Sequence, residues 1–495
     1  MTATLTDALA KVVSGDPDRP AIRSAGDVWS FADLWDRSGR VAAGLLGRLG
    51  SRPGDRIGIL GQNDPAYLAA YFGILRAGCV AVPLNQFLLA SDLVGQLALV
   101  EARYCLVGLI DDPTASTVAA SIPTIPIADL LDTPTRPLPP GDPTADATIL
   151  LTSGTTGSPK GAVQTHASMG FATTELQRVL PFSRDDVMLA FLPFFAAIPE
   201  QILPTLLAGG TIETLPKFDL DAVDEALERA TTCDAVPTIM ARLLHGIDHA
   251  RLANLRWLMF ASEPMAPALL AAWWEALPTV RTYEFYGMTE LLTITVATPD
   301  TLRAAPESVG LPFAGSTVGV VDADGRSVPA GESGEVVCAS PARMRGYLPE
   351  GIDPATWCLP SGAMRTGDLG RFDDAGRLLL TGRIKDLIIS GGLNIAPSEI
   401  EAVAVTHPAV HSAVVVGIPD ARWGETPIVV AIARQGSSLT PAALLDHCRT
   451  GLAPFKRPTG AVLVDAFPMT GIGKSSKAAL RQEIMSGALE VTRVG

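Results

Sequence analysis

Helical and strand patterns alternate along most of this chain, and this alternation restricts the possible folds more than any other feature. Residues 30–46 place apolar side chains at helical spacing, and residues 56–60 form a short apolar run typical of a buried strand. Residues 147–152 form another strand-like run, which leads directly into a glycine-rich segment. Alternation of this kind favours an α/β architecture.

The C-terminal part of the chain has a different pattern, which predicts a compact α+β unit able to fold alone. We expect strands at residues 377–381 and 413–418 and a helix that begins at Pro397. Thr440 and Pro441 are suited to the cap and first position of a further helix.

A proline-rich stretch at 133–143 predicts an exposed connector much earlier in the chain.

Composition excludes several classes of function. The net charge is −14 and no cluster of Lys and Arg is present, which argues against a nucleic acid partner. The six cysteines are scattered singly, so neither a zinc site nor a disulfide framework is expected. No apolar run reaches the roughly 18 residues of a membrane span, and the N-terminus lacks a signal-peptide pattern. We therefore expect a cytoplasmic protein.

The glycine-rich segment after residues 147–152 is suited to binding an anion. Glycines let backbone N–H groups turn toward phosphate oxygens, while the hydroxyl groups of the segment and Lys160 add further donors. An ordinary surface loop rich in Ser and Gly is the alternative. The segment is not a Walker A loop, because Gly161 follows Lys160 where that motif requires Ser or Thr.

A second glycine-rich segment, at residues 468–475, imitates the end of a Walker A loop. Gly473-Lys474-Ser475 matches that ending, but Pro468 stands where the first glycine is required. Proline has no N–H group with which to bind phosphate. Lys474 is therefore interpreted as a mobile cation able to reach an anion, with a plain surface lysine as the alternative.

Two further segments carry groups suited to a nucleotide. Tyr286 offers a ring for stacking on a base, Thr289 a hydroxyl for phosphate, and Glu290 a carboxylate for Mg²⁺. Asp368 follows a glycine, and its carboxylate is suited to accepting hydrogen bonds from two ribose hydroxyls. Arg383 adds a cation. Each segment alone is a weak signal, since such residue pairs are common in turns.

Their joint order is specific, and the chain resembles the acyl- and aryl-CoA synthetase branch of the adenylate-forming enzymes. The resemblance covers about residues 15–485. It rests on segments that occur in the same order as in that family: 77–83, 152–160, 261–264, 286–290, 334–335, 366–368, 382–383, 390–392, 452–458 and 468–474.

The resemblance implies a domain organisation. It predicts a large N-terminal AMP-binding domain, residues 1–381, built of stacked α/β subdomains with a small β-barrel. Residues 382–385 would form a hinge, with Lys385 as the hinge position, and residues 386–495 a small mobile α+β C-terminal domain.

The resemblance also implies roles for individual residues in binding ATP. The phosphates would be held by a loop that comprises Thr152, Ser153, Gly154, Thr155, Thr156, Gly157 and Lys160. Tyr286 would stack on adenine, with Ser262 and Glu263 along its edge. Asp368 would bind the ribose with help from Arg383.

The implied reaction has two steps. In the first, a carboxylic acid attacks ATP, with Thr289 on phosphate, Glu290 on Mg²⁺ and Lys474 between the carboxylate and the α-phosphate. In the second, the C-terminal domain rotates and the acyl group passes to the thiol of CoA, whose pantetheine arm would run past Gly391 and Gly392.

The acid is expected to lie among small and aromatic residues, namely Phe195, Ala196, Ala197, Ala261 and Gly287. At Ala196 the chain departs from CoA ligases of this branch, which commonly carry His there, so the placement of the acid is in question. Glu200 follows closely, and one hypothesis is that it faces a polar or amino group of the substrate. The alternative is an acid in the first turn of a helix after Pro199.

Two rival functions remain open. A stand-alone ligase could load a separate carrier protein or pass the adenylate to another nucleophile. A degenerate homologue could bind nucleotide without catalysis, but it would have lost a catalytic group, and the expected groups Lys474, Glu290, Asp368 and Arg383 are all present.

Overall fold

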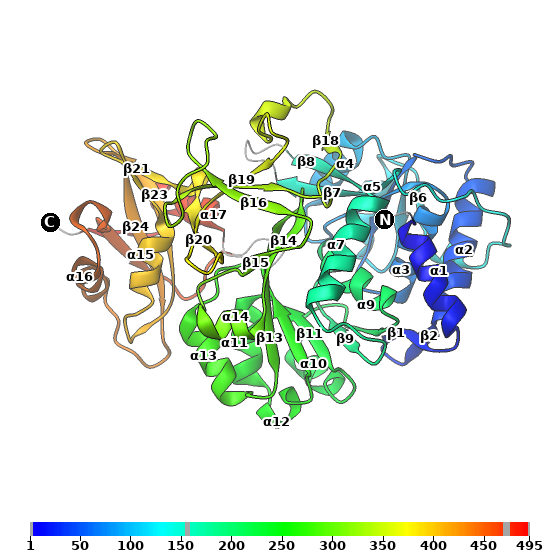
Figure 1. The fold of residues 1–495 in the computed structure, drawn as a ribbon, viewed down its shortest axis with the longest axis horizontal. Helices are drawn as coiled ribbons and strands as arrows, with labels where there is room; N and C mark the ends of the chain where they lie inside the picture. Colours follow the sequence, from blue (N-terminus) through cyan, green and yellow to red (C-terminus); the bar gives the residue numbers. More distant parts are fainter. Residues whose placement is uncertain (1–2, 154–158, 469–475, 494–495) are drawn as a thin grey trace. The chain divides into compact units, whose positions relative to one another are not determined.

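The computed structural model describes residues 3–153, 159–468 and 476–493 (Figure 1). It contains helices and several sheets, which confirms the predicted α/β class. Within these ranges, no helix combines the length and the apolar content that a membrane span requires. All six cysteines are free thiols, in agreement with their scattered positions.

The chain divides into two compact units, which are described separately. The first unit contains residues 1–318 and 338–364, and the second contains residues 319–337 and 365–495. The domain boundary expected at residues 382–385 stays a prediction.

A seven-stranded sheet forms one layer of the first unit. Its central pairs β7–β4, β4–β3, β3–β5 and β5–β6 are parallel, whereas β18–β8 and β8–β7 are antiparallel. In spatial order the strands are β18 (Gly346–Leu348), β8 (Pro159–Thr165), β7 (Asp146–Ser153), β4 (Val80–Pro83), β3 (Arg56–Leu60), β5 (Tyr104–Val107) and β6 (Thr124–Pro126).

A nine-stranded sheet forms the other layer. Its middle, from β13 to β1, is parallel, and its edges are antiparallel. In spatial order the strands are β15 (Leu311–Pro312), β14 (Leu292–Ala297), β13 (Arg281–Met288), β12 (Trp257–Phe260), β11 (Thr232–Ala235), β9 (Val187–Ala190), β10 (Thr211–Thr214), β1 (Pro20–Ser24) and β2 (Asp27–Ser30).

Helices cover these sheets, and helices distant in sequence meet in the core. The N-terminal helix α1 contacts α7, which begins some 150 residues later (Figure 1). The helical segments of the first unit are α1 (Leu5–Gly15), α2 (Phe31–Gly47), α3 (Pro65–Arg76), α4 (Ala90–Leu99), α5 (Asp112–Ala119), α6 (Ala128–Leu131), α7 (His166–Val179), α8 (Phe194–Ala197), η1 (Ile198–Ile202), α9 (Leu203–Leu207), α10 (Leu220–Ala226), α11 (Pro237–Gly246), α12 (His249–Leu252), α13 (Pro267–Ala276), α14 (Pro299–Ala304) and η2 (Pro354–Thr356).

Helix α2 shows how the sequence encodes an element. Ser30 caps its first turn, and the side chain of Asp33 accepts in return from the Ser30 backbone N–H. Its buried face packs on α3, where a Cβ on Gly73 would lie 2.6 Å from Val41. Only glycine permits this close approach.

The second unit contains two sheets. Where a small β-barrel is expected, the strands form a four-stranded sheet in the order β16 (Thr317–Val321), β17 (Gly334–Ala339), β19 (Met364–Phe372) and β20 (Leu378–Arg383). The six-stranded sheet has the order β22 (Leu393–Ile395), β21 (Ile388–Ser390), β24 (Gly424–Ala433), β25 (Gly460–Leu463) and β26 (Thr492–Arg493), with β23 (Val410–Asp420) paired to β24.

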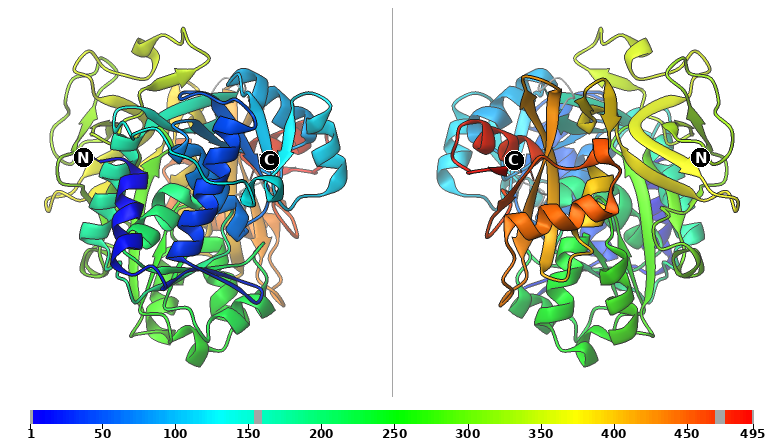
Figure 2. Two further views of the ribbon diagram at one scale, coloured as in Figure 1. Left: turned by 90° about the vertical axis from the view of Figure 1, so that its right-hand side faces the viewer. Right: turned by 90° about the vertical axis from the view of Figure 1, so that its left-hand side faces the viewer.

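Helices lie on both faces of the six-stranded sheet (Figure 2). Val415 of β23 faces α15 (Pro397–Ala404) and α16 (Pro441–Gly451), while its neighbours Val414 and Val416 face α17 (Lys477–Met485). Short 3₁₀ turns complete the unit, η3 (Ile384–Asp386) and η4 (Pro454–Lys456). Both sheet faces are therefore buried, as the nearly continuous apolar strands predict.

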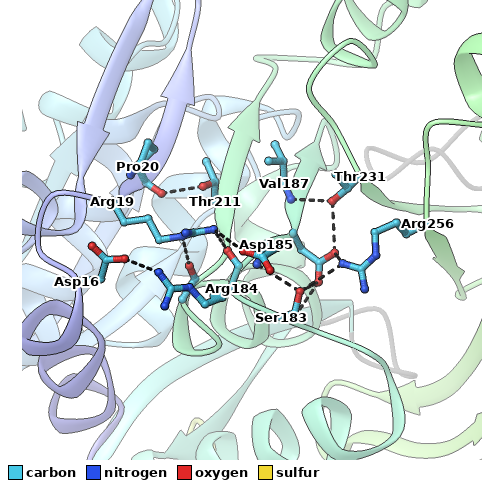
Figure 3. Close-up of polar contacts among 12 residues, drawn as sticks. Asp16, Arg19, Pro20, Ser183, Arg184, Asp185, Val187, Thr211, Thr231 and Arg256 are labelled. Carbon is cyan, nitrogen blue, oxygen red and sulfur yellow. Dashed lines mark hydrogen bonds and ion pairs between the residues drawn. The ribbon is translucent and has the colours of Figure 1, made fainter.

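A buried carboxylate, Asp186, joins three strands of the nine-stranded sheet at the ends where they begin. It accepts from the Ser183 N–H at 2.7 Å and the Ser183 Oγ at 3.0 Å. It also accepts from Thr231 Oγ1 at 3.3 Å and Arg256 Nη1 at 2.5 Å (Figure 3). Asp186, Thr231 and Arg256 directly precede β9, β11 and β12, respectively.

We expect Asp186→Ala to lower the free energy of unfolding by about 3 kcal/mol, because it leaves several donors without their acceptor. The neighbouring Asp185→Ala is the matched control: its side chain is 80% exposed and pairs with Arg19 at 3.4 Å, so the change should stay within about 0.5 kcal/mol. Urea denaturation of both variants measures the difference. Equal midpoints would contradict this role for Asp186.

Candidate active site

The predicted phosphate loop belongs to the hairpin of β7 and β8 in the first unit. Thr152 pairs with Lys160 across the two strands, and Thr152 Oγ1 donates to the Lys160 carbonyl oxygen at 3.5 Å. Ser153 is the last residue of β7. Several predicted site residues lie outside the described part of the chain: Gly154, Thr155, Thr156, Gly157 and Lys474.

The aromatic and acidic motif lies in the hairpin of β13 and β14. Tyr286 is buried near the end of β13, and the strand register shifts between Tyr286 and Gly287. A Cβ on Gly287 would lie 1.8 Å from the Leu292 carbonyl oxygen, so no other residue fits at this bulge. Thr289 and Glu290 occupy the turn that joins the strands.

This turn is held by side chains that the sequence analysis missed. Gln164 Nε2 donates to the Thr289 carbonyl oxygen at 2.9 Å, and Ser168 Oγ donates to Gln164 Oε1 at 2.8 Å. The Met344 N–H donates to the Glu290 carbonyl oxygen at 2.8 Å. No local pattern marks Gln164, because its partner is 125 residues away.

The carboxylate of Glu290 is buried against a neutral partner. Tyr347 Oη donates to Glu290 Oε1 at 2.5 Å. Burial raises the pKa of Tyr347, and the adjacent Glu290 raises it further, so the phenol remains a donor. Lys160 Nζ lies 5.2 Å from the centre of the Tyr347 ring. The structure therefore brings together Lys160 and Glu290, which lie far apart in the sequence.

The chemistry of Glu290 is compatible with Mg²⁺. Among the residues that the structure describes, no group of three or more His, Cys, Asp or Glu side chains could hold a metal ion. Magnesium does not require such a group, since one or two carboxylates usually suffice when phosphates and water supply the other ligands. A carboxylate that is 8% exposed and whose hydrogen-bond donor is neutral fits this pattern.

Three more predicted residues follow β12, at the end of the sheet where the parallel strand β13 also ends. Ala261 is buried, and Ser262 is exposed with φ +76°, a left-handed conformation that is strained for a residue other than glycine. Glu263 Oε2 accepts from Thr238 Oγ1 at 2.7 Å and from the Thr238 N–H at 3.2 Å, at the start of α11. These groups follow the carboxyl end of β12, where open α/β sheets commonly bind ligands.

The expected acid-binding residues Phe195, Ala196 and Ala197 form the short helix α8. Phe195 meets Phe87 edge to face, with ring centres 6.5 Å apart. Ala196 is exposed and Ala197 is buried. The side chain size at Ala196 is therefore not limited by burial, which leaves the departure from His without a packing explanation.

Asn63 fixes the position of this segment and was missed by the sequence analysis. Its Oδ1 accepts from the Phe194 N–H at 2.8 Å. Its Nδ2 donates to the carbonyl oxygens of Ala190 at 3.3 Å, Leu192 at 2.9 Å and Leu215 at 3.1 Å. In the sequence, Asn63 resembles part of an ordinary helix start, because Asp64 and Pro65 follow.

Glu200 lies in η1, a π-helical turn, and follows Pro199 as expected for an acid in a first helical turn. Burial raises its pKa to about 8. Burial, and to a lesser extent Glu200 itself, also raises the pKa of Asp234 at the end of β11. Gln201 Nε2 donates to the Leu189 carbonyl oxygen of β9 at 3.2 Å, which holds η1 against the sheet. The charge of Glu200 on η1 therefore influences Asp234 on β11.

In the second unit, Asp368 and Arg383 meet directly. They are register partners on β19 and β20, and Arg383 Nε lies 2.7 Å from Asp368 Oδ1. The Asp368 N–H donates to Thr366 Oγ1 at 3.1 Å, and the Gly367 N–H donates to Glu335 Oε1 at 3.3 Å. The part of β19 that carries Asp368 is therefore held by both neighbouring strands, β17 and β20.

The glycine pair of the second unit forms a tight turn. Gly391 and Gly392 join the antiparallel strands β21 and β22 with φ of +59° and +81°, a combination that requires glycine-like residues. The Gly391 N–H donates to the Trp423 carbonyl oxygen at 2.8 Å. Lys385, the predicted hinge position, is exposed in η3.

Known proteins resemble this chain over nearly its whole length. The AMP-binding enzyme family matches residues 9–348, and the AMP-binding enzyme C-terminal domain matches residues 399–474. A feruloyl-CoA synthase from Amycolatopsis is 36% identical, covering 94% of this chain and 96% of the relative. The salicyl-AMP ligase/salicyl-S-ArCP synthetase of Mycobacterium tuberculosis is 32% identical, covering 97% of this chain and 91% of the relative.

A solved structure agrees with these matches. ATP-bound MatB from Rhodopseudomonas palustris superposes with a TM-score of 0.90 at 29% identity, covering 97% of this chain and 99% of that one. The fold and sequence define an AMP-forming acid ligase. The chain belongs to the AMP-binding enzyme family, the adenylate-forming enzymes, which confirms the resemblance found in the sequence.

Proposed function

We propose that this enzyme activates a medium-sized carboxylic acid as its acyl-adenylate and transfers the acyl group to CoA. The observation that carries the proposal is the convergence of Lys160 and the buried Glu290 on Tyr347, at the turn expected to meet the ATP phosphates. The pair of Phe195 and Phe87 favours an acid with an aromatic ring.

In this proposal the nucleotide is held in parts. Tyr286 stacks on adenine beside Ser262 and Glu263, and Asp368 accepts from the two ribose hydroxyls with Arg383 alongside. The phosphates are bound by the segment from Thr152 to Lys160 and by Thr289. The buried position of Asp368 keeps its carboxylate dehydrated and ready to accept hydrogen bonds.

The first step joins two anions. A carboxylate oxygen attacks the α-phosphorus, the bond from that phosphorus to the bridging oxygen breaks, and pyrophosphate leaves with the electron pair. Lys474 stabilises the oxygens of both partners, and Thr289 donates to phosphate. Glu290 would hold Mg²⁺, which when bound offsets charge on the phosphate oxygens.

The second step transfers the acyl group to CoA. The thiol sulfur attacks the acyl carbon, AMP departs as leaving group, and the thiol proton goes to solvent or to AMP. Rotation of the C-terminal domain about Lys385 would withdraw Lys474 from the reacting groups and bring the turn of Gly391 and Gly392 to them. That turn lacks Cβ atoms, so a pantetheine arm can pass close to its backbone.

A screen of pyrophosphate release over many carboxylic acids, with and without CoA, tests this function. We expect release with a subset of aromatic acids, and acyl-CoA by mass spectrometry only when CoA is present. Release of ADP or inorganic phosphate in place of AMP and pyrophosphate would refute adenylation.

A carrier protein is the second candidate acceptor, because the relative that is 32% identical carries the name of a carrier-protein synthetase. Adenylate formation without acyl-CoA, followed by acylation of a phosphopantetheine-bearing carrier, would favour this alternative. Intact-mass measurement of the carrier distinguishes the two acceptors.

We further predict that Glu200 selects acids that carry an amino group or another hydrogen-bond donor. Glu200 lies on η1, directly after the predicted pocket residues of α8, and is half-buried in surroundings that raise its pKa to about 8. Glu200→Ala should lower kcat/KM for an amino-substituted acid about 10-fold relative to the unsubstituted acid, which corresponds to about 1.4 kcal/mol for the loss of one hydrogen bond. Identical preference in both enzymes would disprove selection by Glu200.

A further inference from the structure

Tyr347 lies between two oppositely charged side chains of the first unit. Its hydroxyl donates to Glu290 Oε1 at 2.5 Å, and its ring centre is 5.2 Å from Lys160 Nζ. An aromatic ring attracts an ammonium group at this distance through its negative face. One side chain therefore contacts both the predicted metal ligand and the predicted phosphate ligand.

The backbone determines this position. Tyr347 is the central residue of β18 and pairs with Ala162 of β8, two residues beyond Lys160. The Met344 N–H, three residues before Tyr347, donates to the Glu290 carbonyl oxygen at 2.8 Å. Trp357 packs edge-on against the Tyr347 ring, with ring centres 5.7 Å apart. The position of Tyr347 is thus set by strand pairing, by the Glu290 turn and by the ring of Trp357.

This arrangement has a consequence for charge. Without the ring, the Lys160 ammonium and the buried Glu290 carboxylate would be free to pair with each other. Neither group would then be available to bind a ligand. The phenol instead occupies Glu290 Oε1 by a short, charge-assisted hydrogen bond. One carboxylate oxygen is then held by the phenol, which leaves Oε2 as the candidate to meet a cation, while Lys160 stays available to phosphate.

We propose that Tyr347 is a positioning residue, which orients Glu290 toward the Mg²⁺ of the nucleotide and keeps it apart from Lys160. This inference rests on the proposed function, because that function supplies the metal–nucleotide complex. Partners that orient a metal ligand typically contribute 10- to 100-fold to metal affinity.

Tyr347→Phe removes the hydroxyl and keeps the ring. We expect Mn²⁺, titrated in the presence of ATP and followed by electron paramagnetic resonance, to bind about 10-fold more weakly. The Mg²⁺ concentration that gives half-maximal pyrophosphate release should rise by the same factor, with kcat at saturating Mg²⁺ within about 3-fold. Tyr347→Leu removes the ring as well, and should in addition raise the KM for ATP, because Lys160 can then pair with Glu290.

Tyr104→Phe is the matched control. Tyr104 Oη donates to the Leu49 carbonyl oxygen at 2.7 Å and accepts from Arg103 Nε at 3.2 Å elsewhere in the same unit, so this variant also loses a hydrogen-bonded tyrosine hydroxyl. Its metal affinity should equal that of the wild type.

The outcomes separate the inference from the function on which it rests. Unchanged Mn²⁺ affinity in Tyr347→Phe would overturn the inference, and so would a lower Tm and kcat with unchanged metal constants, since a purely structural residue would behave in that way. Weakened Mn²⁺ binding in Tyr347→Phe, together with a wild type that releases no pyrophosphate with any acid, would refute the proposed function but support the role of Tyr347.

Discussion

Lys474→Ala is expected to lower kcat/KM for adenylate formation by about 1000-fold, because no other group then offsets the charge of carboxylate and α-phosphate together. The same variant should still convert supplied acyl-adenylate and CoA to the thioester at near the wild-type rate. The split follows from the proposed use of Lys474 in the first step alone. Pyrophosphate release measures the first step, and chromatography of acyl-CoA measures the second.

Lys477→Ala is the control for this variant. Lys477 stands three residues later in the sequence, on α17, and its ammonium group lies 2.8 Å from Glu401 Oε1, so its removal also deletes one positive charge from this part of the chain. Both steps should stay within about 3-fold of wild type, because this half-buried ion pair takes no part in the proposed reaction. A Lys474→Ala enzyme with normal ATP-driven turnover would remove the role assigned to Lys474.

Elements encoded by local chemistry were predictable from the sequence. The strand predicted at residues 56–60 is β3, and the helical pattern of residues 30–46 forms α2, whose N-cap is Ser30. Thr440 likewise caps α16, and its side chain accepts from the Ala443 N–H. In each case the determining residues lie within a few positions of one another, so the pattern is visible in one window.

The contacts that assemble the candidate site were not predictable in this way. Gln164 holds the Thr289 turn and Asn63 holds α8, each through backbone groups more than 100 residues away. A buried amide that bonds to distant backbone has no periodic signature, because the partner is a main-chain atom of any residue type. The motif residues themselves could be found, since their order along the chain carries the resemblance.

The conformation of Glu200 illustrates the same limit. The sequence predicts an acid in a first helical turn, which is observed, but the turn is π-helical and brings Glu200 toward Asp234 of a strand. Whether an acid near a proline faces solvent or a second carboxyl group depends on which strand the helix packs against. That packing is set by Gln201 and the β9 backbone, not by the local sequence.

Asp368→Ala should raise the KM for ATP about 100-fold while kcat at saturating ATP changes by less than about 3-fold. The proposed role has the carboxylate accepting from two ribose hydroxyls, and each hydrogen bond to a charged group contributes about 1.5–3 kcal/mol. Two such bonds therefore account for a factor of 100 or more. The ribose is remote from the reacting phosphorus. Loss of the hydrogen bonds to the ribose therefore weakens binding in the ground state and in the transition state alike, and it appears as a higher KM.

The turn of the same hairpin supplies the control. Asp373 also lies in the β19–β20 hairpin and accepts from the Arg377 N–H at 2.9 Å and from Arg377 Nε at 2.6 Å. Asp373→Ala should lower Tm by loosening that turn and leave the KM for ATP unchanged. A 2′,3′-dideoxy ATP analogue completes the test, because it lacks the two hydroxyl groups from which Asp368 would accept hydrogen bonds. If Asp368 binds them, the wild type must discriminate strongly against the analogue and Asp368→Ala must not; equal discrimination by both enzymes would assign the ribose to another residue.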